Sequence, residues 1–277
     1  MTRKVIKKTS TLSLKNIKEN KLSIQFNLDG FSFSIYSPAS KKVVYFREYA
    51  FENSQTSPEN LLLKIEAIFK TDPYLQNDFV TVLVIHQNNL STLVPDRFFD
   101  EKELTSYLNF NIKTLATDFI SFDAIEVLDA KNIYIPYVNI NNYLFQNFGE
   151  FEYKHHSSVL IENLLSNTTN TTKTMYVNVS KTTIDVVVLE KEKLVLFNTF
   201  SYNSKEDFIY YVLFVAAQLN LDVHEFPLYF MGKITLNSNA YKITYQYIKN
   251  VYFLESTNTI FNEFNIPSHS NYILLGS

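Results

Sequence analysis

Residues 22–51 show an alternation of apolar and polar positions that is interrupted twice. The first interruption is Asp29-Gly30, and the second is a polar turn at Ser37–Ser40, after which Val43–Phe51 is again largely apolar. Alternation with period two indicates strands, and Asp-Gly between two such runs is typical of a tight hairpin turn. The pattern therefore predicts three successive antiparallel strands.

A helix and a buried strand complete this unit. Ser57 and Pro58 are favoured residues for the N-cap and the first turn of a helix, and apolar residues follow at helical spacing up to Phe69. Phe79–Ile85 is almost wholly apolar, as expected of a strand that is covered on both faces. The unit has the order strand, strand, strand, helix, strand.

The same order recurs later in the chain. Ser204 is the expected cap of a helix that runs to about Leu219 and is apolar on most sides, so we expect it to be deeply buried. The strands predicted around this helix are Met175–Val179, Thr182–Leu189, Leu194–Tyr202 and Phe226–Met231. Ser23–Ser37 aligns with Tyr176–Glu190, so the chain contains an internal repeat.

The segments outside the two copies set the expected domain boundaries. We predict helices from Asp100, over Asn139–Asn147, Ser157–Leu165 and Ala240–Ile248, and strands near Ala124–Leu128, Asn132–Ile135 and Val251–Leu254. Asn167–Thr174 (NTTNTTKT) is polar throughout and is interpreted as a linker. The predicted organisation is a basic arm over 1–21, a first half over 22–166 with an insertion at about 88–122, the linker over 167–174, and a second half over 175–277.

Composition excludes several kinds of chemistry. The 277-residue chain has no Cys, which excludes disulfides, thiolate catalysis and cysteine-based zinc sites, and its five His lack metal-binding spacing, so no metal is expected. It has only four Gly, whereas phosphate-binding loops need glycine where the backbone approaches a ligand. The longest apolar run, Phe208–Ala217, is shorter than the roughly 20 residues of a membrane span. No signal region follows the start, so we expect a cytoplasmic protein.

Charge is uneven along the chain. The net charge of −3 argues against a nucleic-acid-binding protein, but residues 1–21 are strongly basic. Their charged residues are Arg3, Lys4, Lys7, Lys8, Lys15, Lys18 and Lys21 against Glu19. Either a frayed, solubilising terminus or a contact with phosphate or an anionic membrane explains them.

The repeated order of three antiparallel strands, a helix and a parallel strand resembles the actin-like ATPase superfamily over residues 22–255. The chain is similar to the type IV pilus assembly protein PilM and, more closely, to an uncharacterised bacterial domain-of-unknown-function family with a degenerate actin-like plan. The resemblance implies an α/β fold of two ribonuclease-H-like subdomains, each with a mixed five-stranded sheet flanked by helices.

The resemblance also assigns positions to a nucleotide site. Members that hydrolyse ATP carry an acid–any–glycine–Thr/Ser signature at the first hairpin of each repeat, and paired glycines in a loop that contacts adenosine. The corresponding positions here are Gln25, Asn27, Asn178, Ser180, Thr182 and Gly232. Gln25 and Asn178 replace the acids, and an amide is a weak ligand for Mg²⁺. The substitutions also weaken the hypothesis of a ribonuclease-H nuclease, which needs several acids around two metals.

Other polar residues carry weaker signals. His155-His156 lies next to Ser157-Ser158, but neighbours in sequence rarely orient one another for proton transfer, so a strand-to-helix junction is expected. His86 ends an apolar strand and is interpreted as a structural histidine. Asp185 lies within a strand and is expected at the solvent surface or at an interface.

These observations favour a non-catalytic actin-like scaffold or adaptor that binds a protein partner and needs no cofactor. The edge strand Val43–Phe51 is expected to pair with a strand of that partner. The alternative is a divergent ATP-binding actin-like ATPase that uses the remaining hydroxyl and amide groups. A third hypothesis, nucleic-acid contact through residues 1–21, predicts binding that depends steeply on salt and is lost when those residues are deleted.

Overall fold

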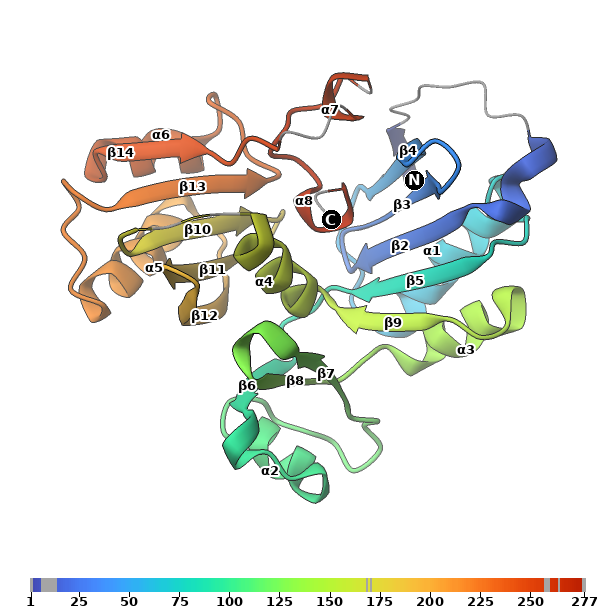
Figure 1. Ribbon diagram of the computed structural model, residues 1–277, viewed down its shortest axis with the longest axis horizontal. Helices are drawn as coiled ribbons and strands as arrows, with labels where there is room; N and C mark the ends of the chain where they lie inside the picture. Colours follow the sequence, from blue (N-terminus) through green and yellow to red (C-terminus); the bar gives the residue numbers. More distant parts are fainter. Residues whose placement is uncertain are drawn as a thin grey trace. The chain divides into compact units, whose positions relative to one another are not determined.

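The computed structural model describes residues 2–5, 14–167, 169, 171–256, 260–263 and 265–275 (Figure 1). The chain divides into two compact units. The first contains residues 1–159 and 262–265, and the second contains residues 160–261 and 266–277. Helix α4 (His156–Asn167) spans the boundary between them.

A mixed six-stranded sheet forms the centre of the first unit, in the order β1-β4-β3-β2-β5-β9. Its strands are β1 (Thr2–Val5), β2 (Lys21–Asn27), β3 (Gly30–Ser37), β4 (Lys42–Phe51), β5 (Thr81–His86) and β9 (Glu152–His155). Strands β2, β3 and β4 are antiparallel neighbours, whereas β5 is parallel to β2 and β9 to β5. Asn27 pairs with Gly30, so the predicted turn at Asp29-Gly30 is confirmed.

The core of this unit follows from the alternation in the sequence. Ile24 and Phe26 of β2 are fully buried and pack with Leu61 and Ile65 of α1 (Pro58–Thr71). Ser57 caps α1, because its side chain accepts the backbone N–H of Asn60 at 3.4 Å. Helix α3 (Val138–Phe148) adds apolar residues to the same cluster.

The N-terminal segment differs from the expectation of a frayed arm. Residues Thr2–Val5 form strand β1, which pairs antiparallel with Glu48–Phe51 of β4. Leu14–Glu19 form a short 3-10 helix, η1, while residues 6–13 of the predicted arm lie outside the described residues. The expectation that Val43–Phe51 presents a free edge is therefore wrong for its C-terminal part, because backbone groups of the chain's own N-terminus pair with it.

A small antiparallel sheet, ordered β6-β8-β7, is inserted between β5 and α3. Its elements are β6 (Ser91–Pro95), η2 (Asp96–Phe98), η3 (Glu101–Glu103), α2 (Leu104–Asn109), β7 (Ser121–Ile125), η4 (Glu126–Leu128) and β8 (Ala130–Tyr134). The sheet continues to Tyr134, beyond the insertion expected to end at about residue 122. Most of the strand expected at Ala124–Leu128 is the 3-10 turn η4, which ends at Asp129 in a left-handed conformation (φ 47°).

The second unit repeats the plan with a five-stranded sheet, ordered β12-β11-β10-β13-β14. Its strands are β10 (Thr174–Val179), β11 (Thr183–Glu190), β12 (Lys193–Ser201), β13 (Pro227–Gly232) and β14 (Asn250–Phe253). Its helices include α5 (Lys205–Gln218), α6 (Asn239–Tyr247) and α8 (Tyr272–Leu275), while α7 (Ile260–Glu263) is divided between the two units. The order β12-β11-β10-β13 matches β4-β3-β2-β5, which confirms the predicted duplication. The predicted linker ends inside β10, and Thr168 and Asn170 lie outside the described residues.

Helix α5 has a capping box, in which Ser204 and Asp207 satisfy each other's backbone N–H groups. One face is buried, as predicted, but Tyr210 is 61% exposed and Phe214 is 43% exposed. The expectation that α5 is deeply buried is wrong for the face that contains Tyr210 and Phe214, because no element among the described residues covers it. None of the helices in the described part of the chain, α5 included, combines the length and the apolarity needed to cross a membrane.

Candidate functional site

In the first unit, the resemblance places Gln25 where an acid is expected and Asn27 where a glycine is expected. Both side chains bind a third side chain of the same unit, that of Gln87. Gln25 Nε2 and Asn27 Nδ2 both donate to Oε1 of Gln87, at 2.9 and 3.0 Å. Gln87 directly follows β5, the strand parallel to β2, and this parallel pairing places it next to the end of β2. One oxygen of the Gln87 side chain thus accepts hydrogen bonds from both Gln25 and Asn27. These two residues stand where the resemblance expects an acid and a glycine.

The hairpin turn beside these residues also uses its own polar groups. Asn27 Oδ1 accepts the backbone N–H of Asp29 at 2.8 Å. In ATP-binding members of the superfamily, the resemblance implies that amides of this turn face phosphate. Here the side chain of Asn27, at the expected glycine position, accepts the hydrogen bond of one such amide, that of Asp29.

In the second unit, Asn178 belongs to a row of polar side chains across three strands. Asn178 on β10 is the register partner of Asp185 on β11, which is the partner of Thr199 on β12. Asn178 Nδ2 donates to Asp185 Oδ2 at 2.9 Å, and Thr199 Oγ1 donates to Asp185 Oδ1 at 2.8 Å. Asp185 is only 1% exposed, so its expected place at solvent or an interface is wrong. The carboxylate lies on the neighbouring strand, where hydrogen bonds from the chain itself satisfy it.

The turn after β10 contains Ser180 and Thr182. The Ser180 N–H donates to the Thr183 carbonyl at 2.9 Å, and the hydroxyl of Tyr202 donates to the Ser180 carbonyl at 2.7 Å. The backbone N–H of Tyr202 donates to the Thr182 carbonyl at 2.9 Å. These bonds fasten the turn to the segment that follows β12.

Gly232, at the end of β13, is needed by the packing of the chain itself. Its φ is +86°, and a Cβ placed on it would lie 2.4 Å from the Val179 carbonyl oxygen and 2.7 Å from Asn178 Oδ1. Its N–H donates to the His269 carbonyl at 2.8 Å. The close approach of β10 accounts for the glycine without any nucleotide.

We expect Gly232→Ala to lower the free energy of unfolding by about 2–3 kcal/mol, from the left-handed backbone and from overpacking against Val179. Gly149→Ala is the matched control, since Gly149 also has positive φ (+72°) but a Cβ added to it would meet no atom within 4 Å. The control carries the backbone cost without the overpacking, about 1–3 kcal/mol, because φ 72° with ψ −137° is close to a region that essentially only glycine adopts. A loss in Gly232→Ala that is no larger than the loss in the control, measured by urea denaturation, would contradict the packing account.

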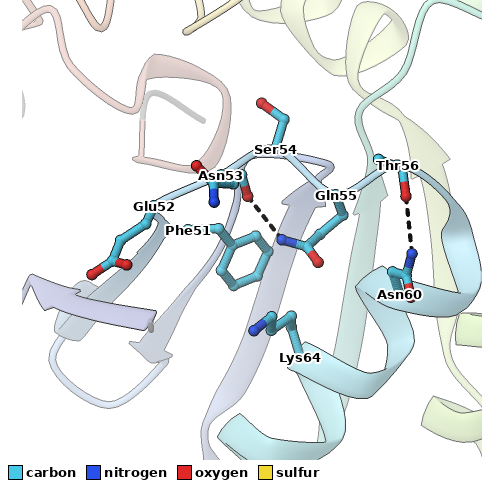
Figure 2. A pocket seen from close by; sticks show the side chains of 8 residues that line it. All are labelled: Phe51, Glu52, Asn53, Ser54, Gln55, Thr56, Asn60 and Lys64. Atoms are coloured by element: carbon cyan, nitrogen blue, oxygen red, sulfur yellow. Dashed lines mark hydrogen bonds between the residues drawn. The ribbon is translucent and has the colours of Figure 1, made fainter.

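A pocket of about 240 Å³ is lined by the end of β4, the loop that follows it and residues of α1 (Figure 2). Gln55 Nε2 donates to the Asn53 carbonyl at 2.8 Å, and Asn60 Nδ2 donates to Thr56 Oγ1 at 3.0 Å. The pocket also contains one cation, Lys64, and one carboxylate, Glu52. Most of its polar groups are engaged in holding the loop in shape.

A cluster of buried polar side chains surrounds the junction of β9 and α4. His155 Nδ1 lies 2.7 Å from Ser157 Oγ, and Asn132 Nδ2 donates to the hydroxyls of Ser157 and Ser158 at 2.9 and 2.8 Å. Asp123 Oδ2 accepts the Ser158 hydroxyl at 2.5 Å and the backbone N–H of His155 at 2.8 Å. The serine–histidine contact resembles part of a catalytic triad, but His155, Ser157 and Ser158 are fully buried. The cluster fastens the small sheet to the strand-to-helix junction, which lies where the sequence predicts it.

His86 is the register partner of His155 on the neighbouring strand. It accepts the Tyr137 N–H at Nδ1 (3.2 Å), and its Nε2 lies 2.9 Å from Asn141 Oδ1. Burial lowers the pKa of His86 to about 4, although the bond to Asn141 opposes this shift. Burial, and then the nearby His156 and His86, hold the pKa of His155 well below its ordinary value. Both histidines are therefore neutral structural residues at ordinary pH.

Sequence reasoning missed the residues that engage the predicted positions. Gln87 and Thr199 belong to no motif, and Asp123 and Asp185 are scattered acids in the sequence. Their common signal is sheet register: each lies beside its partner only once the strand order and pairing are known.

Solved structures of similar fold extend over nearly the whole chain. A Bacteroides thetaiotaomicron protein with an actin-like ATPase fold and unknown function matches at a TM-score of 0.82 and 22% identity, covering 96% of this chain and 98% of that one. PilM of the PilM–PilN type IV pilus biogenesis complex matches at 0.55 and 10% identity, covering 92% and 97%. The ethanolamine utilization protein EutJ from Carboxydothermus hydrogenoformans matches at 0.50 and 8% identity, covering 93% and 88%. The predicted actin-like ATPase fold is thereby confirmed.

No curated protein matches the chain. A family model does match, over residues 9–251, which is most of its length. Together with the duplicated fold, this match shows that the chain belongs to the family described as "Protein of unknown function (DUF3822)".

Proposed function

We propose that this protein is a non-catalytic actin-like scaffold or adaptor that binds a protein partner. The observation that carries the proposal is that both acid positions hold amides, Gln25 and Asn178, whose Nε2 and Nδ2 groups donate to side chains of the same chain. An ATPase of this superfamily needs carboxylates there to hold Mg²⁺ through water, because this hard cation prefers charged oxygen ligands.

The two halves have each lost the acid expected at the nucleotide site, and different neighbouring groups engage the replacing side chains. This supports the proposal that the protein no longer depends on nucleotide. In the first half, Gln87 engages the amides and Asn27 occupies a turn N–H. In the second half, Asp185 engages the amide, and the packing of Val179 accounts for Gly232. A single altered position is compatible with a shifted active site, whereas parallel losses favour a fold retained for its surface.

The partner class is supported by one of the similar structures. PilM is solved as a PilM–PilN complex, so this fold serves there as a component of a protein assembly. At 10% identity, the likeness to PilM concerns the fold alone. It does not identify the partner of the present chain.

Thermal unfolding with and without millimolar Mg²⁺-ATP tests the loss of nucleotide binding. We expect no shift of the midpoint relative to Mg²⁺ alone. A ligand present at 100 times its dissociation constant would stabilise the protein by about 2.7 kcal/mol. For a chain of this size, that corresponds to an upward shift of several degrees, at about 2–4 °C per kcal/mol.

A clear upward shift with Mg²⁺-ATP would instead support the alternative, a divergent ATP-binding actin-like ATPase. The partner is tested separately, by purification of the tagged full chain from its native host. Recovery of no partner in stoichiometric amount would count against the adaptor.

A further inference from the structure

The pocket lined by the end of β4 and by α1 contains a lysine that has no partner among the described residues. Lys64 lies on α1 and is half-buried. Figure 2 shows its side chain extending from the helix beneath the loop. It forms neither a hydrogen bond nor an ion pair with any residue that the structure describes.

Lys64 differs in this respect from the other basic residues of the described ranges that are not exposed. Arg47 and Lys131 form ion pairs with carboxylates. Lys173 donates to a backbone carbonyl at 3.4 Å, and Lys154 also has an interaction within the chain. A half-buried ammonium gives up part of its hydration, so an anion in the pocket would compensate it.

Neutral donors line the same pocket as Lys64. The Thr56 hydroxyl accepts Asn60 Nδ2 at 3.0 Å, so its own hydrogen remains available for a ligand. The Asn53 side chain forms no hydrogen bond with the described residues, and its amide offers two further hydrogens. A cation combined with such donors suits the oxygens of a carboxylate or a phosphate.

The carboxylate that lines the pocket does not neutralise Lys64. Glu52 is exposed, forms no ion pair with Lys64 and already has an interaction elsewhere in the chain. The pocket volume of about 240 Å³ is below the roughly 300–1,000 Å³ of sites for drug-sized ligands. The pocket therefore suits a small ion or a single charged group.

We propose that this pocket binds a small oxyanion, a phosphate or a carboxylate, whose oxygens accept hydrogen bonds from Lys64 Nζ, the Thr56 hydroxyl and the Asn53 amide. The proposal does not rest on the adaptor function. It is also separate from the degenerate nucleotide site, because none of the positions assigned to that site lines the pocket.

Thermal unfolding of the full chain in phosphate, acetate and chloride at equal ionic strength tests the proposal. An anion at about ten times its dissociation constant should raise the midpoint by about 3–5 °C relative to chloride. A shift with phosphate alone assigns the pocket to phosphate groups, and a shift with acetate alone assigns it to carboxylates. A shift with neither anion would overturn the proposal.

Lys64→Met separates binding in the pocket from the general stabilisation that phosphate gives to folded proteins. We expect this variant to lose the extra shift, whereas Lys70→Met, at an exposed lysine of the same helix, should keep it. In chloride, Lys64→Met should be at least as stable as the parent, because no described residue loses a partner. Equal shifts in the parent and both variants would overturn the proposal.

Discussion

Replacing Arg47 by methionine is expected to lower the free energy of unfolding by about 3–5 kcal/mol, because it leaves a buried carboxylate without its cation. Arg47 Nη1 donates to Asp72 Oδ2, and the two side chains are 9% and 0% exposed. The Tyr49 hydroxyl donates to the same oxygen at 2.5 Å. Burial, followed by the bond to Asp72, raises the pKa of Tyr49 to about 12, so this donor stays protonated.

Aromatic rings complete the surroundings of this ion pair. The Arg47 guanidinium lies 5.1 Å from the ring centroid of Tyr45 and 5.7 Å from that of Tyr74. The pair joins β4 to the residue that follows α1, so its loss affects the contact between helix and sheet. Urea denaturation monitored by circular dichroism measures the effect.

Lys18→Met is the matched control for Arg47→Met. Lys18 Nζ lies 2.7 Å from Asp78 Oδ2, but the side chains are 78% and 76% exposed. An ion pair in water contributes about 1 kcal/mol or less, so this variant should unfold almost as the parent does. The double variant Arg47→Met/Asp72→Asn should recover part of the stability lost in Arg47→Met. No recovery would show that side-chain packing, not the unpaired charge, causes the loss.

The stability of the first unit is expected to fall as pH is lowered from 6.5 towards 5. Burial lowers the pKa of His86 to about 4 in the folded chain, against about 6.5 for an unfolded histidine. Below pH 6.5, His86 binds a proton in the unfolded chain but stays neutral in the folded chain until the pH approaches 4. Protonation therefore favours unfolding. The stabilising effect is fully present above pH 6.5, and for His86 about 2 kcal/mol of it is lost at pH 5.

Two neighbouring groups modify this dependence. His155, whose pKa is also lowered by burial, adds to the loss in the same direction. Burial raises the pKa of Asp123, against hydrogen bonds from Ser158, His155 and Tyr134, and this works in the opposite sense. A carboxyl with a raised pKa favours the folded state as pH falls towards 3.8, so this gain offsets part of the loss caused by the two histidines.

Denaturation at a series of pH values in His86→Gln isolates the contribution of His86. Glutamine retains a donor and an acceptor for Asn141 and Tyr137 but does not titrate, so the slope between pH 6.5 and 5 should decrease by about 1.4 kcal/mol per pH unit or less. His224→Gln, at an exposed histidine of the second unit, is the control for the substitution itself. An unchanged slope in His86→Gln would contradict the assignment.

The sequence by itself determined the repeated strand order, the hairpin at Asp29-Gly30 and the caps at Ser57 and Ser204. These features depend on local periodicity and turn chemistry, which are properties of neighbouring residues. The resemblance, read through the strand order, also assigned positions to a degenerate nucleotide site, and that assignment stays a prediction. The caps and the hairpin appear in the structure at the predicted residues.

Only the tertiary structure decided which groups lie next to these positions. Gln87 reaches Gln25 through the parallel pairing of β2 with β5, and Asp185 reaches Asn178 through antiparallel register, neither of which is encoded in sequence spacing. Strand β1 covers part of β4 although its residues suggested a frayed arm, because backbone pairing does not need an apolar pattern. The apolar run of α5 predicted deep burial, but helix periodicity cannot say how many neighbours a helix finds, and one of its faces remains exposed.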